Sequence, residues 1–190
     1  MEFAATAADR AKRIKLIIFD VDGVLTDGGI YVGETGELFK PFYCRDGLAI
    51  TLARQNGLKT AIITGRSSKQ VQTRAKDLSI DAVWQGCSDK REAYAELKQK
   101  FNLSDEDICY VGDDLIDLPV MVQVGLSAAV GDAVPEVRAR AHLVTDFYGG
   151  RGAVRQVIEF IFKAQGKWDT IVEEYLRADN EPQKLPQVTQ

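Results

Sequence analysis

The chain has 190 residues, of which 45% are hydrophobic and 27% are charged, a balance typical of a single globular domain. A formal net charge of −4 at pH 7 argues against sequence-independent binding of nucleic acid, which needs a basic face. No apolar run approaches the ~20 residues of a membrane span, and three cysteines without zinc-binding spacing or a signal segment favour a cytoplasmic protein with no membrane partner.

The first half of the chain begins with a polar leader, residues 1–13. A continuous apolar run at 14–19 predicts a buried strand, and the polar turn at 33–37 lies between two β-like runs, 29–32 and 38–43. The segment at about 28–43 is therefore expected to form a β-hairpin flap. We expect a helix to follow from Asp46, as its N-cap, to about residue 56.

The rest of the chain alternates between strand and helix patterns. The expected strands are 58–64, 82–84, 108–111 and 126–130. One expected helix begins at residue 67, and the others cover 89–101, 115–124, 135–141, 154–164 and 168–176. Residues 179–190 have no core pattern and are expected to form a mobile tail.

This alternation predicts an α/β fold of Rossmann type. The mostly parallel sheet would carry helices on both faces, in a single domain spanning residues 14–178. Too few residues separate Asp22 from the first full helix for a large cap domain, so only the hairpin flap could cover a site there.

Polar residues follow four of the expected strands. They are Asp20 and Asp22, then Thr64, Gly65 and Arg66, then Lys90, and finally Asp113, Asp114 and Asp117. Because the carboxyl ends of parallel strands meet at one edge of the sheet, these side chains should converge in one crevice. Taken singly, each cluster is as well explained by a helix cap or a solvated loop. Their occurrence together, in this order, favours a catalytic site.

The combination suits phosphoryl transfer. Asp20 and Asp113 offer hard oxygen ligands for Mg²⁺, which a carboxylate needs in order to approach a phosphate dianion. Thr64 and Lys90 could hold the phosphate oxygens as charge spreads over them. Asp22, two residues from Asp20, could protonate the leaving alkoxide and then deprotonate the attacking water.

The order of these motifs resembles the haloacid dehalogenase superfamily. Residues 19–27 read FDVDGVLTD, residues 63–66 read ITGR, and residues 112–117 read GDDLID, with Lys90 between the last two. The resemblance implies an aspartyl-phosphate on Asp20, with Asp22 as general acid and base. It further implies phosphoryl binding by Thr64 and Lys90, and Mg²⁺ binding by Asp20, Asp113 and the carbonyl of Asp22, supported by Asp114 and Asp117.

Two further segments, RDG at 45–47 and GGRGAVR at 149–155, make the chain similar to the capless 3-deoxy-D-manno-octulosonate 8-phosphate phosphatase family. That resemblance implies a homotetrameric hydrolase of lipopolysaccharide precursor synthesis. The substrate contacts that it implies are Asp22, Tyr43, Cys44, Arg45, Asp46, Gly47, Thr51, Gly65, Arg66, Arg74 and Lys90. Tyr43 and Thr51 differ from the residues expected at their positions in that family.

The inferred substrate carries a carboxylate at one end and a phosphate at the other. Arg45, Arg66 and Arg74 suit the carboxylate, because a guanidinium group can bind it through two hydrogen bonds. The loop at 149–152 is either a plain turn or a subunit contact or lid, and His142 is expected to be structural.

Alternatives remain at this point. The same chemistry could act on a nine-carbon sialic-type sugar acid 9-phosphate or on a broader set of sugar phosphates. A non-hydrolytic phospho-receiver would carry an adjacent acidic pair after the first strand, whereas here the adjacent pair, Asp113 and Asp114, comes late. A catalytically weak scaffold would have no reason to keep all four clusters.

Overall fold

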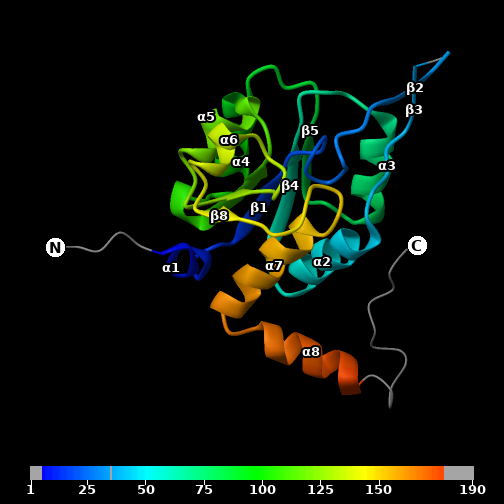
Figure 1. Ribbon diagram of the computed structural model, residues 1–190. Coiled ribbons are helices and arrows are strands. Elements are labelled where there is room, and N and C mark those ends of the chain that lie inside the picture. The colour runs from blue at the N-terminus through cyan, green and yellow to red at the C-terminus, as the bar shows by residue number, and fades with distance from the viewer. Residues whose placement is uncertain (1–5, 35, 178–190) are drawn as a thin grey trace.

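The computed structural model describes residues 6–34 and 36–177, and its centre is a parallel sheet of six strands (Figure 1). The strand order is β5-β4-β1-β6-β7-β8, and each neighbouring pair is parallel. The strands are β1 Leu16–Phe19, β4 Lys59–Ile63, β5 Ala82–Trp84, β6 Ile108–Gly112, β7 Leu126–Ala129 and β8 Leu143–Val144. The first strand of the sheet therefore lies at its centre, between β4 and β6.

The central strands are buried on both faces. All four residues of β1 are fully buried, as are Ile108 to Val111 of β6, which explains their unbroken apolar sequences. Phe19 at the end of β1 pairs with Ile62 of β4 and Val111 of β6. Asp20 consequently leaves the sheet between two neighbouring strand ends.

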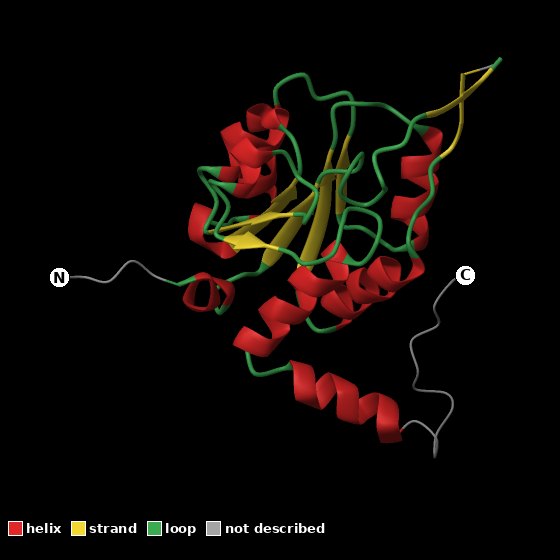
Figure 2. Cartoon of the chain, viewed as in Figure 1, coloured by secondary structure: helices red, strands yellow, loops and turns green. Residues whose placement is uncertain are grey.

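Helices cover both faces of the sheet (Figure 2). Helices α2, α3 and α7 lie on one side and α4, α5 and α6 on the other, while α1 and α8 pack against α7. The helices are α1 Ala7–Ala11, α2 Cys44–Gln55, α3 Lys69–Asp77, α4 Lys90–Phe101, α5 Leu118–Met121, α6 Pro135–Arg138, α7 Ala153–Ala164 and α8 Trp168–Arg177. Among the described residues, none of these helices has the length and apolar character needed to cross a membrane.

The predicted hairpin forms a separate antiparallel ribbon, with β2 at Tyr31–Gly33 and β3 at Gly36–Phe39. It projects away from the body of the molecule beyond α3 (Figure 1). No other strand or helix lies between β1 and α2 in the part of the chain that the structure describes. The α/β fold, the parallel sheet and the small flap without a large cap are thus confirmed.

Several predicted boundaries are wrong, and three of them have an identifiable physical cause. Helix α2 begins at Cys44 and not after Asp46, because the Asp46 carboxylate accepts hydrogen bonds from the start of α7. The helix expected at 115–124 is a 3-10 turn, Leu115–Asp117, followed by the single turn of α5, which begins at Leu118 and has Pro119 in its first turn. The second hairpin strand ends at Phe39, because the next residue, Lys40, turns inward and is buried.

Two elements were not predicted. The edge strand β8 has two residues, too few to show an alternating pattern. Helix α1 lies in the segment 1–13 that was expected to be a polar leader, and Ala11 at its end is fully buried. The tail expected at 179–190 lies outside the described residues.

Candidate active site

The acidic clusters that follow β1 and β6 come together at the carboxyl edge of the sheet. Oxygens of Asp20, Asp113 and Asp117 lie within 4.8 Å of one another. Burial, followed by the nearby charges of Asp20 and Asp117, raises the pKa of Asp113 to about 8. Burial likewise raises the pKa of Asp20 to about 6, although Lys90 opposes the shift. Carboxylates crowded in this way need a cation between them.

The donor set fits Mg²⁺. Asp113 Oδ1 is buried and accepts no hydrogen bond from any residue that the structure describes. A buried carboxylate oxygen without a partner is costly, and a metal ion would satisfy it. Asp20 and Asp113 would therefore hold the ion directly, together with the backbone carbonyl of Asp22 that the family resemblance implies.

Asp117 plays a different part, because both of its oxygens are already engaged. Oδ1 accepts hydrogen bonds from Lys90 Nζ at 2.7 Å and from the Tyr110 hydroxyl at 2.7 Å. Oδ2 accepts from the backbone N–H groups of Asp113 and Asp114, at 2.9 and 3.2 Å. Asp117 thus fixes the loop that carries Asp113 and also orients Lys90.

Lys90 is the first residue of α4, and its neighbour Asp89 caps that helix. Its side chain is almost completely buried, and Nζ lies 2.8 Å from Asp20 Oδ1. Burial alone would lower the pKa of Lys90, but the carboxylates of Asp20 and Asp117 raise it above its ordinary value. The ammonium group therefore stays charged beside Asp20, the predicted nucleophile.

The loop after β1 depends on Gly23. Its φ of +92° lies in the left-handed region, and a Cβ there would come within 2.1 Å of Asp113 Oδ2. The loop can therefore approach the metal ligands only with glycine at this position.

The same loop packs on the segment before α7. The Gly150 N–H donates to the Val24 carbonyl at 2.9 Å, and a Cβ on Gly149 would lie 1.7 Å from the Gly23 carbonyl oxygen. The loop at 149–152 therefore packs against the loop after β1 and supports it.

Asp22, the expected general acid and base, lies among charged side chains from two other segments. Lys40 Nζ forms an ion pair with its Oδ1, and Arg66 Nε lies 3.8 Å from its Oδ2. Glu37 contacts the same two cations, at 3.0 Å from Lys40 Nζ and 3.6 Å from Arg66. Burial raises the pKa of Glu37, but hydrogen bonds from Lys40 and Ser68 outweigh it and keep that carboxylate ionised.

Thr64, Gly65 and Arg66 directly follow β4, which lies beside β1. Thr64 is buried, whereas Gly65 and the outer half of Arg66 are exposed. Their position at the carboxyl edge agrees with the predicted phosphate and substrate contacts.

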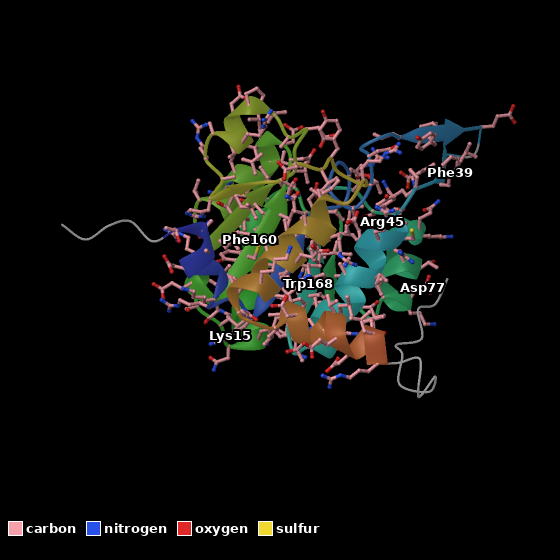
Figure 3. All side chains as sticks on the ribbon, turned by 60° about the horizontal axis from the view of Figure 1, so that its bottom comes forward. Lys15, Phe39, Arg45, Asp77, Phe160 and Trp168 are labelled. Carbon is pink, nitrogen blue, oxygen red and sulfur yellow. The ribbon has the colours of Figure 1, made fainter. Side chains whose placement is uncertain are left out.

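Some of the residues predicted to contact substrate around the start of α2 lie at the surface, and others point into the protein. Cys44 and Arg45 are exposed and Tyr43 is half-buried. Figure 3 shows Arg45 at the beginning of α2, toward the hairpin where Phe39 is labelled. Arg74 of α3 lies 5.8 Å from the Phe42 ring, and its guanidinium group lies so close to Gly47 that a Cβ there would be 2.3 Å away.

Asp46 and Thr51 point into the protein. The Asp46 carboxylate is buried and accepts hydrogen bonds from the N–H groups of Gly152 and Arg155, at 3.2 and 2.7 Å. The Thr51 hydroxyl donates to the Gly47 carbonyl at 3.1 Å. Both were predicted to contact substrate, but these internal partners favour structural roles. His142 is also structural, since its Nδ1 accepts from the Ser127 N–H at 3.0 Å.

Three residues of this site had no signal in the sequence. Lys40 and Glu37 lie in the predicted hairpin flap but outside the motifs, and Tyr110 belongs to an apolar strand. Only the folded chain places Lys40 beside Asp22 and the Tyr110 hydroxyl beside Asp117. A lysine directly after an apolar β-run is usually a solvated residue, so the pattern alone would not have indicated a buried charge.

Comparison with known proteins agrees with this geometry. The family model for haloacid dehalogenase-like hydrolases matches residues 83–158. The 3-deoxy-D-manno-octulosonate 8-phosphate phosphatase of Escherichia coli K12 is 49% identical over 166 residues, which cover 87% of this chain and 88% of that protein.

Solved structures show the same likeness. The corresponding phosphatase of Yersinia pestis is 49% identical with a TM-score of 0.84, covering 86% of this chain and 88% of that one. The phosphatase of Moraxella catarrhalis, solved with magnesium, phosphate and KDO, is 40% identical with a TM-score of 0.86, covering 89% of this chain and 97% of that one. This chain therefore belongs to the 3-deoxy-D-manno-octulosonate 8-phosphate phosphatase family of haloacid dehalogenase-like hydrolases.

Proposed function

We propose that the chain hydrolyses 3-deoxy-D-manno-octulosonate 8-phosphate to the free sugar acid and inorganic phosphate, in the synthesis of a lipopolysaccharide precursor. The observation that carries the proposal is the position of Asp20. Its carboxylate is 4% exposed, lies 2.8 Å from the Lys90 ammonium, and shares a cluster with the unsatisfied oxygen of Asp113. These are the parts that a nucleophile for a phosphate dianion requires.

The reaction would proceed in two steps on Asp20. In the first, the Asp20 carboxylate attacks phosphorus, the bond from phosphorus to the sugar oxygen breaks, and Asp22 gives its proton to that oxygen. In the second, Asp22 takes a proton from water as the water oxygen attacks phosphorus, which frees Asp20 and inorganic phosphate. Bound Mg²⁺ would offset the negative charge between phosphate and carboxylates, while Thr64 and Lys90 hold the phosphoryl oxygens.

Recognition of the sugar acid would fall to the side chains around the opening of the site. Arg66 lies at the end of β4, half exposed and near Asp22, and Arg45 is exposed at the start of α2. A guanidinium group there could bind the substrate carboxylate through two hydrogen bonds. Arg74 contacts Phe42 and the Gly47 backbone, so it supports the 43–47 segment as well.

The test is Mg²⁺-dependent phosphate release from 3-deoxy-D-manno-octulosonate 8-phosphate, a nine-carbon sialic-type sugar acid 9-phosphate and simple hexose phosphates. We expect the highest kcat/KM for the eight-carbon acid. Equal or better turnover of the nine-carbon acid, or of hexose phosphates, would reject this substrate and leave the aspartyl-phosphate chemistry in place. A stable phosphoprotein without turnover would instead indicate a receiver, and no phosphorylation at all a scaffold.

We further propose that the protein acts as a homotetramer in the cytoplasm. Support for assembly comes from the hairpin, where Ile30, Tyr31, Val32, Leu38 and Phe39 are all exposed and the rings of Tyr31 and Phe39 stack at 4.5 Å. An apolar group of this kind is typical of a surface that another chain covers. The three cysteines, unpaired within the described residues, are compatible with a reducing compartment.

A further inference from the structure

Lys40 follows the second strand of the hairpin and is buried at the edge of the active site. Its side chain is only 1% exposed, which is rare for a lysine and is tolerated only when the charge is paired. Nζ contacts Glu37 Oε1 at 3.0 Å and also forms an ion pair with Asp22 Oδ1. Neither the sequence motifs nor the reaction described above uses this residue.

The second of these contacts is the informative one. Glu37 lies three residues from Lys40 on the same hairpin and would serve as a partner without any help from the catalytic loop. The pair with Asp22 joins the hairpin to the loop after β1, across 18 residues of sequence. Lys40 therefore fixes the one carboxyl group that must exchange a proton with the substrate.

The arrangement distinguishes the two oxygens of Asp22. Oδ1 faces the buried ammonium group of Lys40, while Oδ2 has only the longer contact of 3.8 Å with Arg66, whose side chain is 49% exposed. Oδ2 is thus the less engaged oxygen and the one suited to give a proton to the leaving oxygen and to take one from water. A carboxyl group held at one oxygen presents the other in a single orientation, which proton transfer requires.

We propose that Lys40 is a positioning residue for the general acid and base, Asp22. The proposal rests on the aspartyl-phosphate chemistry given above but not on the identity of the sugar. It places the hairpin flap in the catalytic machinery of its own chain, through one buried ion pair. A purely structural Lys40 would hold the hairpin and affect every substrate alike.

Leaving groups separate these two roles. A sugar phosphate expels an alkoxide, which needs a proton from Asp22 as the bond breaks. A p-nitrophenyl phosphate expels a stable phenolate, which leaves without that proton. Hydrolysis of the aspartyl-phosphate, in which Asp22 acts as base, is common to both substrates and can limit kcat for either. The comparison therefore uses kcat/KM, which reports only the steps up to departure of the leaving group. Loss of the positioning contact should lower kcat/KM for the alkyl phosphate much more than for the aryl phosphate, whereas a distorted site or a displaced flap lowers both.

The experiment compares kcat/KM of Lys40→Met on the best alkyl phosphate of the panel and on p-nitrophenyl phosphate. We expect kcat/KM for the alkyl phosphate to fall by about 10²-fold, in the range of general acid catalysis, and kcat/KM for the aryl phosphate by less than about 3-fold. Lys40→Arg should restore most of the alkyl activity, because it keeps a cation beside Asp22. If Lys40→Met yields no folded protein by circular dichroism, Lys40→Gln gives the same comparison.

Two further variants complete the test. Lys59→Met removes a lysine whose Nζ lies 3.0 Å from Asp81, well away from the site, and should change neither substrate. Glu37→Gln removes the hairpin partner of Lys40 and leaves Asp22 paired, so the ratio of alkyl to aryl kcat/KM should stay near that of the wild type. Equal losses of kcat/KM on both substrates, no loss on either, or the same ratio change in Glu37→Gln would overturn the proposal. If the wild-type protein failed to hydrolyse the eight-carbon acid but turned over another alkyl phosphate normally, the proposed substrate would be wrong. The role proposed for Lys40 would still be tested on that other alkyl phosphate.

Discussion

Asp20 is the proposed nucleophile, and it lies almost out of contact with water. Its backbone N–H donates to the Val111 carbonyl at 3.1 Å, so its position is fixed by the sheet itself. Its carboxylate faces Lys90, which in turn is held by Asp117 and Tyr110. Few rotamers are open to a side chain placed in this way, and the nucleophile is in position before substrate arrives.

Replacing Asp20 by Asn should abolish turnover and preserve the fold. The amide has the same shape but cannot form the acyl phosphate, so we expect kcat to fall by at least about 10³-fold. The melting temperature should not fall, because one of three crowded carboxylates loses its charge. Phosphate release and thermal unfolding check the two halves of this prediction. Activity above a few per cent of wild type would exclude Asp20 as the nucleophile.

Asp113 tests the metal site independently of the reaction. Its buried Oδ1 accepts no hydrogen bond from the described residues, so Mg²⁺ should bind there and raise the melting temperature of the wild-type protein. Asp113→Asn should lose this response while its metal-free form remains as stable as the wild type. Asp169→Asn is the matched control, since Asp169 is exposed on α8 and should leave the response intact. An unchanged Mg²⁺ shift in Asp113→Asn would remove Asp113 from the metal site.

At the scale of elements, the RDG segment joins α2 to α7. The Asp46 carboxylate satisfies two N–H groups at the start of α7, a helix that has no side-chain cap on its own N-cap residue, Gly152. The preceding residue, Arg45, is exposed and free to face a ligand. We therefore expect adjacent residues of one motif to have separate tasks, Asp46 in stability and Arg45 in recognition.

The two tasks predict opposite phenotypes. Asp46→Ala should lower the free energy of unfolding by about 2 kcal/mol, because it leaves two buried N–H groups without an acceptor. Arg45→Ala should leave stability unchanged and raise KM for the sugar-acid phosphate. Denaturant unfolding and steady-state kinetics of both variants decide the matter. A stable Asp46→Ala with a raised KM would restore Asp46 to the substrate contacts that the family resemblance implied.

The elements also show which structural features could be predicted from the sequence. Unbroken apolar runs such as that of β1, and the helical stripe of α7, were predictable because burial dictates them. The four polar clusters were predictable because a parallel sheet brings its strand ends together. The early start of α2 and the inward turn of Lys40 were not, because each is set by a partner more than 15 residues away. Tertiary contacts of that kind leave no local pattern.

At the scale of the whole molecule, the hairpin is the least self-sufficient part. Figures 1 and 2 show it extending from the body, and its side chains Val32, Leu38 and Phe39 are each at least half exposed. Yet its base reaches the active site through Lys40 and Glu37, and Gln70 of α3 contacts the Glu37 and Leu38 carbonyls at 3.4 Å. An isolated two-stranded ribbon is only marginally stable in water. Whatever covers its outer part would therefore also steady the residues around Asp22.

A single charge on this ribbon should separate the subunits. Val32 is 69% exposed in one chain, so Val32→Lys costs the monomer little but places an unpaired ammonium group in the proposed interface. We expect light scattering to show a tetramer for the wild type and a smaller species for the variant, with reduced kcat because the hairpin is no longer held. Val122→Lys changes a residue that is 65% exposed at the end of α5, and it should leave assembly and activity unchanged. A wild-type monomer with full activity, or a Val32→Lys protein that assembles normally, would contradict this interface. The flap would then keep its own position, and that of Asp22, without a neighbouring chain.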